Sequence, residues 1–291
     1  MFHGSIPALV TPFKNGAIDR DAFANLIERQ IEGGSSALVP CGTTGESATL
    51  SQDEHKEVVE LCIQVAAGRV PVIAGAGSNS TREAIALIEH AKSVGSDAAL
   101  AICPYYNKPD QAGLEAHFSA INDAVSMPII LYNVPSRTAC DLLPETVAKL
   151  AKLPNIVGIK DASNDLGRVS MQAALTAGEQ FTQLSGEDPS SLGHRAMGGA
   201  GCISVTANVA PDLCAQMHKA FDAGDLETAQ KIDQRLIHIH KAMFASPSPG
   251  PAKYVLAKME LCSDEVRLPI VGADDSTKAQ IDQAMARAGL N

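Results

Sequence analysis

VPVIAGAGSNSTREAIALIEHAKSVGSDAALAIC, residues 70–103, contains the repeating unit on which the fold prediction rests. Two short apolar runs, 70–75 and 98–103, flank the stretch 80–95, in which apolar residues recur with the period of a helix. Ser80 stands where a helix N-cap belongs and Gly95 where a C-cap belongs. The stretch therefore predicts a strand, a helix and a second strand. Continuous apolar runs are typical of strands in a parallel sheet that is covered on both faces.

The same pattern recurs over about the first 205 residues. Stretches 19–34 and 51–68 also have helical period, with Ser51 in an N-cap position and Gly33, Gly34 and Gly68 in C-cap positions. Such strand–helix units, spaced by roughly 30 residues, favour the α/β class and a (β/α)8 TIM barrel. A doubly wound open sheet is the alternative that periodicity alone leaves open. The predicted strands are 5–10, 37–40, 70–75, 98–103, 128–134, 156–160, 181–186 and 201–205.

The end of the chain differs from the rest. From about residue 210 there is no strand pattern, and residues 225–245 and about the last twenty have helical composition. We therefore expect a catalytic barrel over residues 1–224 and a C-terminal helical region over residues 225–291.

Composition excludes several classes of protein. The formal net charge is -10 and no basic run is present, so nucleic acid and anionic membranes are poor partners. We find neither a secretory signal nor the ~20 apolar residues that cross a bilayer. The seven cysteines are scattered, which indicates reduced thiols and a cytoplasmic protein. Cysteines and histidines do not cluster as metal ligands do, and we expect no metal.

Chemically active side chains follow the predicted strands. In a barrel, the active site lies at the carboxyl ends of the strands. Hydroxyl groups, tyrosines, one arginine and one lysine gather there, a concentration that predicts an enzyme. The segments are CGTTGES (41–47), GAGSNS (75–80), PYYN (104–107), YNVPSRT (132–138), KDAS (160–163) and SGED (185–188).

Lys160 stands at the end of the apolar run VGIK (157–160). An unpaired ammonium group is costly in apolar surroundings, and a neutral lysine amine is a nucleophile. An ion pair with Asp161 is the simpler alternative, although neighbours on a strand point to opposite faces.

Three other features have two interpretations each. GTTGE (42–46) places hydroxyls and backbone N–H groups before a helix, which suits a carboxylate but is also a common turn. Tyr132 is either a packed aromatic or a catalytic residue. Arg137 is either a surface ion-pair partner or a bidentate ligand for a substrate carboxylate.

With GTTGES, YNVPSRT and VGIKDAS in this order, the chain resembles the pyruvate-dependent class I aldolases, the N-acetylneuraminate lyase family. The resemblance continues through SGED, GCISVTANVAP (201–211) and SPSPGPAKY (246–254). The arginine loop YNVPSRT resembles that of one branch of the family, whose members condense pyruvate with L-aspartate 4-semialdehyde. Relatives that act on another aldehyde or 2-oxo acid share the lysine but not that arginine loop, and such an enzyme is the alternative. A non-catalytic sensor of small molecules is the second alternative, although the complete set of reactive residues argues against it.

The resemblance implies a reaction without a separate cofactor. Lys160 would form a Schiff base with pyruvate, and the product would be 4-hydroxy-tetrahydrodipicolinate, formed in the first committed step of lysine and diaminopimelate biosynthesis. The protein would be a homo-oligomer, commonly a tetramer made of two dimers. Tyr132, Thr44 and Tyr106 would relay protons, with Tyr106 coming from a neighbouring subunit. The substrate-binding residues would be Thr43 and Thr44 for pyruvate, Arg137 for the semialdehyde carboxylate, and Gly186 and Ile203 as pocket lining.

The resemblance also implies feedback inhibition by lysine. Gln52 departs from the histidine of some sensitive relatives, so the strength of inhibition stays open. Ser248 stands where some relatives have asparagine, and its effect is equally open. The positions that would form the lysine site are Ser47, Ala48, Gln52, His55, Asn79, Glu83 and Tyr105.

Overall fold

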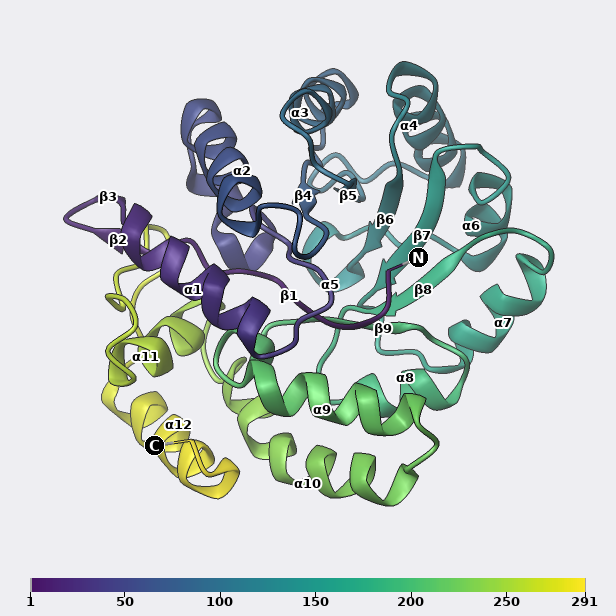
Figure 1. The fold of residues 1–291 in the computed structure, drawn as a ribbon. Helices are drawn as coiled ribbons and strands as arrows, with labels where there is room; N and C mark the ends of the chain where they lie inside the picture. The colour runs from purple at the N-terminus through teal and green to yellow at the C-terminus, as the bar shows by residue number, and fades with distance from the viewer. Residues whose placement is uncertain (1, 291) are drawn as a thin grey trace. The chain divides into compact units, whose positions relative to one another are not determined.

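The computed structural model describes residues 2–290 (Figure 1). These residues divide into two compact units. One unit consists of the first residues together with Ile73–Ile203, and the other of Gly4–Val72 together with residues 204–290. The division predicted at residue 224 stays a prediction.

The unit of Ile73–Ile203 is built on a parallel sheet whose strands are neighbours in the order of the sequence. The register pairs Tyr132 with Lys160 and Lys160 with Leu184. The backbone register alone therefore places Tyr132 and Lys160 on neighbouring strands at the same level of the sheet. The strands are β4 (Ile73–Gly75), β5 (Ala98–Ile102), β6 (Ile129–Asn133), β7 (Ile156–Asp161), β8 (Thr182–Ser185) and β9 (Gly201–Ser204).

Helices connect these strands, and α3, α4, α6 and α7 form a row beside the sheet (Figure 1). Phe118 and Ile121 on α4 are fully buried and pack in one cluster with Ile129 and Leu131 of β6. This burial explains why the strands are apolar without alternation. The helices are α3 (Thr81–Ser93), α4 (Gln111–Ala124), α5 (Pro135–Thr138), α6 (Pro144–Leu150), α7 (Gly167–Leu175) and α8 (Ser191–Ala196).

The second unit begins with β1 (Gly4–Pro7). The predicted strand 37–40 is present only as two parallel bridges, from Ala8 to Val39 and from Leu38 to Val72. A short hairpin of β2 (Phe13–Lys14) and β3 (Ala17–Ile18), which the sequence analysis did not predict, turns at residues 15–16. Both turn residues have positive φ (56° and 82°), as the tight turn of a hairpin requires.

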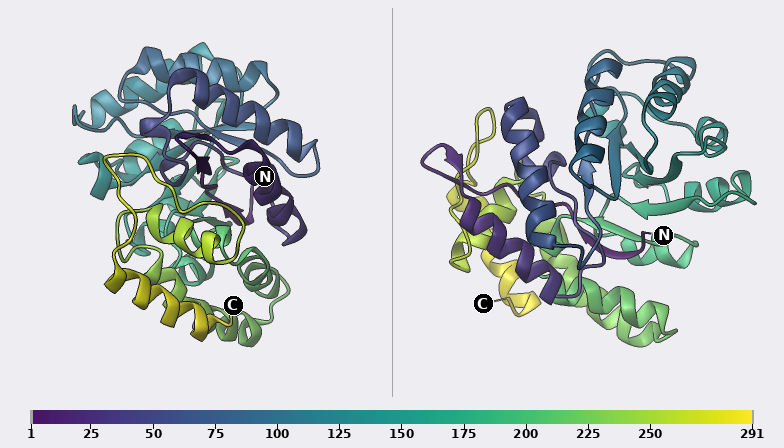
Figure 2. Two further views of the ribbon diagram at one scale, coloured as in Figure 1. Left: turned by 90° about the vertical axis from the view of Figure 1, so that its left-hand side faces the viewer. Right: turned by 45° about the horizontal axis from the view of Figure 1, so that its top comes forward.

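The helices of this unit bury their apolar faces against one another. Leu236, Ile239, Val255 and Ile281 are fully buried in one cluster. Figure 2 shows α10 running beside α9 and α12, which it contacts. The elements are α1 (Arg20–Glu32), η1 (Thr43–Gly45), η2 (Ser47–Thr49), α2 (Gln52–Ala66), η3 (Thr206–Asn208), α9 (Pro211–Asp222), α10 (Leu226–Ala242), α11 (Gly250–Lys258) and α12 (Asp275–Ala288).

The two predicted N-cap residues, Ser51 and Ser80, form different hydrogen bonds. Ser51 forms a capping box on α2: the Glu54 N–H donates to Ser51 Oγ at 3.2 Å, and the Ser51 N–H donates to Glu54 Oε2 at 2.8 Å. Ser80 precedes α3 as predicted, but its side chain makes no capping bond. Its N–H instead donates to Ser78 Oγ at 3.1 Å.

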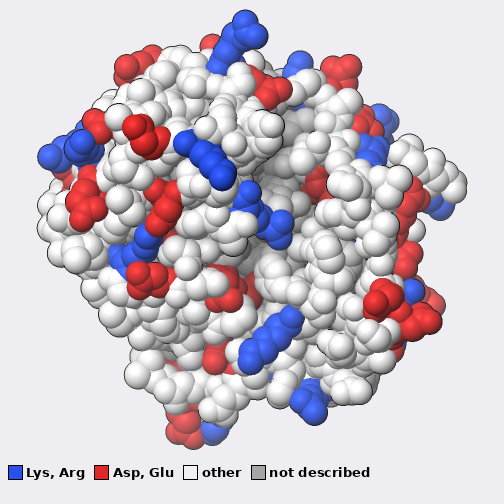
Figure 3. Space-filling model, turned by 180° about the vertical axis from the view of Figure 1, so that it is seen from behind, with Lys and Arg blue, Asp and Glu red and all other residues white. Residues whose placement is uncertain are grey.

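Parallel strands and bridges that alternate with helices confirm the predicted α/β class, the (β/α)8 barrel with C-terminal helices. Within residues 2–290, no helix combines the length and hydropathy that crossing a bilayer requires. Acidic and basic side chains are interspersed on the face shown in Figure 3.

Candidate active site

Lys160 lies near the end of β7 and is 6% exposed. Its Nζ lies 4.3 Å from the centre of the Tyr132 ring, which is 6% exposed itself. The simpler alternative, an ion pair with Asp161, does not form within the described residues. The Asp161 carboxylate instead accepts hydrogen bonds from the Ser163 N–H at 2.7 Å and the Gln172 amide at 3.4 Å. The amine of Lys160 therefore faces an aromatic ring in a largely dry environment.

Gly186 follows β8 and packs directly against the lysine. Its N–H donates to the Asp161 carbonyl at 2.7 Å. A Cβ atom at this position would lie 3.1 Å from Lys160 Cε and 2.8 Å from Ala162 Cβ. Glycine is therefore the residue that leaves room for the lysine side chain. Ile203, 1% exposed, follows the Ser185–Cys202 pair of β8 and β9 by one residue.

Arg137 lies on α5, a single helical turn that leaves the end of β6. Pro135 begins the turn, and Ala139 ends it in the left-handed region with φ 58°. The Arg137 side chain is exposed, and it forms no ion pair in the part of the chain that the structure describes. It is thus available to an anionic ligand.

Tyr106 is not brought together with Lys160 and Tyr132. It is 89% exposed and has a φ of 73°, which is unusual for a residue with a side chain. The segment that presents it is held by two hydrogen bonds. The Asn79 amide donates to the Tyr105 carbonyl at 3.1 Å, and the Asn107 amide donates to the Asn79 carbonyl at 2.9 Å.

Thr43 and Thr44 belong to the other unit, in η1. Thr44 is 4% exposed. The N–H groups of Gly45, Glu46 and Ser47 donate to carbonyls inside the turn. Those of Thr43 and Thr44 have no acceptor within residues 2–290, so two neighbouring donors are left for a ligand.

The residues of the predicted lysine site fall in both units. Within the unit of Ile73–Ile203, Asn79 contacts Tyr105 as described, and Glu83 accepts a short hydrogen bond from the Ser78 hydroxyl. In the other unit, Ser47 and Ala48 form part of η2, and Gln52 and His55 lie on the first turns of α2.

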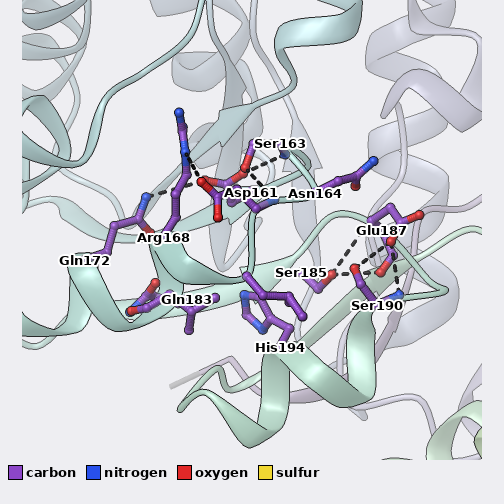
Figure 4. Close-up of a pocket in the computed structure, with 13 residues that line it drawn as sticks. Asp161, Ser163, Asn164, Arg168, Gln172, Gln183, Ser185, Glu187, Ser190 and His194 are labelled. Atoms are coloured by element: carbon purple, nitrogen blue, oxygen red, sulfur yellow. Dashed lines mark hydrogen bonds and ion pairs between the residues drawn. The ribbon is translucent and has the colours of Figure 1, made fainter.

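A small polar pocket lies beside the ends of β7 and β8 (Figure 4). Asp161, Arg168, Glu187 and His194 line it, whereas Lys160 and the tyrosines do not. Burial lowers the pKa of His194 to about 4, so its ring is neutral at pH 7. The pocket therefore lies beside the end of β7 without including Lys160 in its lining.

Two polar networks in the structure were not predicted from the sequence. Asn133, Asp141 and Arg168 join the end of β6 to α7. Glu46 and Lys253 form a fully buried ion pair at 2.6 Å, although they are 207 residues apart. Only the position of Lys253 in an apolar helix could have signalled a buried partner. Within residues 2–290, no group of three or more potential metal ligands is found.

The chain is similar to known proteins over nearly its whole length. The Dihydrodipicolinate synthetase family matches residues 1–288. The 4-hydroxy-tetrahydrodipicolinate synthase of Hyphomonas neptunium is 70% identical, with 100% of each chain covered. The chloride-inhibited dihydrodipicolinate synthase of Acinetobacter baumannii, solved with pyruvate, is 41% identical with a TM-score of 0.97 over 100% of each chain. The Cyanidioschyzon merolae enzyme, solved with lysine bound, is 39% identical with a TM-score of 0.96, covering 100% of this chain and 99% of that one. This chain belongs to the dihydrodipicolinate synthetase family.

Proposed function

We propose that this chain condenses pyruvate with L-aspartate 4-semialdehyde to 4-hydroxy-tetrahydrodipicolinate, the first committed step of lysine and diaminopimelate biosynthesis. One observation carries the proposal: the buried amine of Lys160, 4.3 Å from the Tyr132 ring at the end of a barrel strand. Its setting in a chain that matches the family over residues 1–288 supports the same reaction.

Covalent catalysis by Lys160 begins the proposed reaction. The amine attacks the ketone carbon of pyruvate and water leaves, which gives a Schiff base. The imine withdraws electrons, so the methyl group loses a proton and becomes an enamine. The enamine carbon then attacks the aldehyde carbon of the semialdehyde, whose oxygen takes up a proton and becomes a hydroxyl group. The amino group of the semialdehyde finally replaces Lys160 at the imine carbon, which closes the ring and releases the lysine amine.

Two anion-binding features support the choice of substrates. The unused N–H groups of Thr43 and Thr44 suit the pyruvate carboxylate. The exposed fork of Arg137 suits the carboxylate of the semialdehyde. An aldolase for a polyhydroxy sugar acid is the alternative, and it has less use for an arginine at this place. Gly186 and Ile203 are proposed to line the pyruvate pocket.

Proton transfer is proposed to use Tyr132, Thr44 and Tyr106. Tyr106 is 89% exposed and held in an unusual backbone conformation, which fits a residue that is completed by a second copy of the chain. We therefore propose a homo-oligomer, with a tetramer of two dimers as the expected form. A cytoplasmic location is proposed because the seven cysteines are scattered along the sequence.

Feedback inhibition by lysine is proposed from the predicted lysine site. The Glu83 carboxylate suits the ammonium groups of the inhibitor, and Asn79 and Tyr105 already contact each other. Ser47, Ala48, Gln52 and His55 complete the proposed set. An activity unaffected by millimolar lysine would reject this part of the proposal.

The first experiment measures consumption of aspartate semialdehyde by purified protein, with and without pyruvate. We expect pyruvate-dependent consumption, and borohydride should trap pyruvate on the wild type but not on Lys160→Ala. Lys149→Ala is the matched control, because Lys149 forms an exposed ion pair with Glu115 on the outer helices. A folded wild type that consumes no semialdehyde would refute the proposed reaction. Trapping on Lys160→Ala would refute the role of the lysine.

A further inference from the structure

The loop that carries Arg137 has little structure of its own. Residues 134–143 connect β6 to α6 and contain only the single turn α5. A helix of four residues is unstable in isolation. A side chain on such a turn can be held at one position only if contacts outside the turn fix the loop.

Those contacts come from a chain of three buried or half-buried side chains. Asn133, fully buried at the end of β6, donates to Asp141 Oδ1 at 2.9 Å and accepts the Leu142 N–H at 3.0 Å. Arg168 on α7 approaches Asp141 with both guanidinium nitrogens, Nη1 at 2.8 Å. Gln111 on α4 donates to the Asp141 carbonyl at 2.7 Å. The loop is thus tied to three separate elements through one aspartate.

The charge state of Asp141 suits this role. Burial opposes its ionisation, but hydrogen bonds from Arg168 and Asn133 outweigh burial and lower the pKa of Asp141 below its ordinary value. The side chain of Arg168 is 15% exposed and that of Asp141 34% exposed, so solvent screens the pair only in part. A two-point contact of an arginine with a carboxylate also fixes direction, which a lysine would not do.

The same chain of contacts begins at the reactive residues. Asn133 directly follows Tyr132, and the register of β6 and β7 pairs Asn133 with Asp161, next to Lys160. The end of β6 at Asn133, together with the bond from its side chain to Asp141, therefore links Lys160 to the loop that carries Arg137.

We propose that Asn133, Asp141 and Arg168 form a brace that positions Arg137 for the carboxylate of the aldehyde substrate. Asp141 and Arg168 are positioning residues in this account, because they act through the loop and do not touch substrate. The inference rests on the proposed function. It adds that selection of the second substrate depends on the Asp141–Arg168 ion pair, which acts through the loop.

Asp141→Asn tests the brace with almost no change in shape. The new amide would present N–H groups to the Arg168 guanidinium, so a donor would face a donor. We expect the KM for aspartate semialdehyde to rise about tenfold, while the KM for pyruvate and the borohydride-trapped adduct stay within about twofold of the wild type. Arg168→Lys, made in the presence of Asp141, keeps the positive charge. It should raise the KM for aspartate semialdehyde less than Asp141→Asn does. Glu115→Gln is the matched control, because it neutralises an exposed carboxylate of the same unit that is paired with Lys149.

Amide hydrogen exchange gives a readout that does not depend on the reaction. Residues 138–142 should exchange faster in Asp141→Asn than in Glu115→Gln. If the wild type consumes no semialdehyde, the proposed function fails, and exchange alone then decides whether the brace holds the loop. Unchanged exchange in Asp141→Asn would overturn the brace. An equal rise in both KM values, or a fall in kcat with both KM values unchanged, would overturn its role in positioning Arg137.

Discussion

Replacing Lys253 by methionine tests whether the C-terminal helices hold the GTTGES turn in place. The Lys253 side chain is fully buried, and its Nζ donates to Glu46 Oε1 at 2.6 Å and to the Glu265 carbonyl at 2.8 Å. The Phe13 ring centre lies 4.1 Å from the same nitrogen. Glu46 ends the turn that contains Thr44 and has a φ of 55°. The carboxylate of Glu46 thus joins the predicted pyruvate-binding turn to α11.

The expected loss of stability depends on which contacts residue 253 and Glu46 retain after the substitution. Methionine is similar in length to lysine, so little packing is lost. Glu46 would stay buried without its cation, and removing one partner of a buried pair costs about 3–5 kcal/mol. The Arg267 N–H still donates to Glu46 Oε2 at 2.8 Å, which offsets part of this cost. We therefore expect the free energy of unfolding to fall by about 3 kcal/mol, roughly a hundredfold in the folding equilibrium.

Urea unfolding followed by circular dichroism measures this change. Protein concentration is held constant, since association alters apparent stability. Lys258→Met is the matched control, because Lys258 pairs with Asp282 at side-chain exposures of 42% and 41% and should matter little. The double variant Glu46→Gln with Lys253→Met should recover part of the loss. A midpoint shift for Lys253→Met no larger than that for Lys258→Met would refute the stabilising role of the Glu46–Lys253 pair, as would a simply additive double variant.

Three further predictions concern the barrel. Gly186→Ala should slow formation of the trapped pyruvate adduct by about tenfold or more, because the added methyl would lie 3.1 Å from Cε of the proposed Schiff-base lysine; unchanged trapping would contradict this. Burial lowers the pKa of His117 to about 4, so the unfolded chain binds more protons below about pH 6.5 and stability falls towards pH 4. Urea midpoints across this range should depend less on pH in His117→Gln, whereas the exposed His238→Gln should match the wild type. Ser51→Ala should cost about 1 kcal/mol in urea unfolding, because the capping box with Glu54 is lost; no change would show that the cap is dispensable.

Much of the architecture could be predicted because it is local. The apolar runs at 98–103 and 128–134 became β5 and β6, and Ser51 caps α2, since hydrogen bonding along a strand or within a turn depends on neighbouring residues. The hairpin at residues 13–18 was missed because its strands are only two residues long. The run 37–40 could not be told apart from a longer strand, since the number of its ladder bonds depends on the neighbouring strands.

The strand–helix order and the position of Lys160 at the end of an apolar strand follow from the order of residues alone. The contacts of each polar side chain depend on how distant elements pack. Asp141 pairs with Arg168 across 27 residues and Glu46 with Lys253 across 207, and nothing in the local pattern specifies either pair. The physical reason is separation along the chain, because the periodicity of a sequence indicates only the helix or strand to which a residue belongs. The partner of a buried charge is chosen by packing between elements that are distant in the chain.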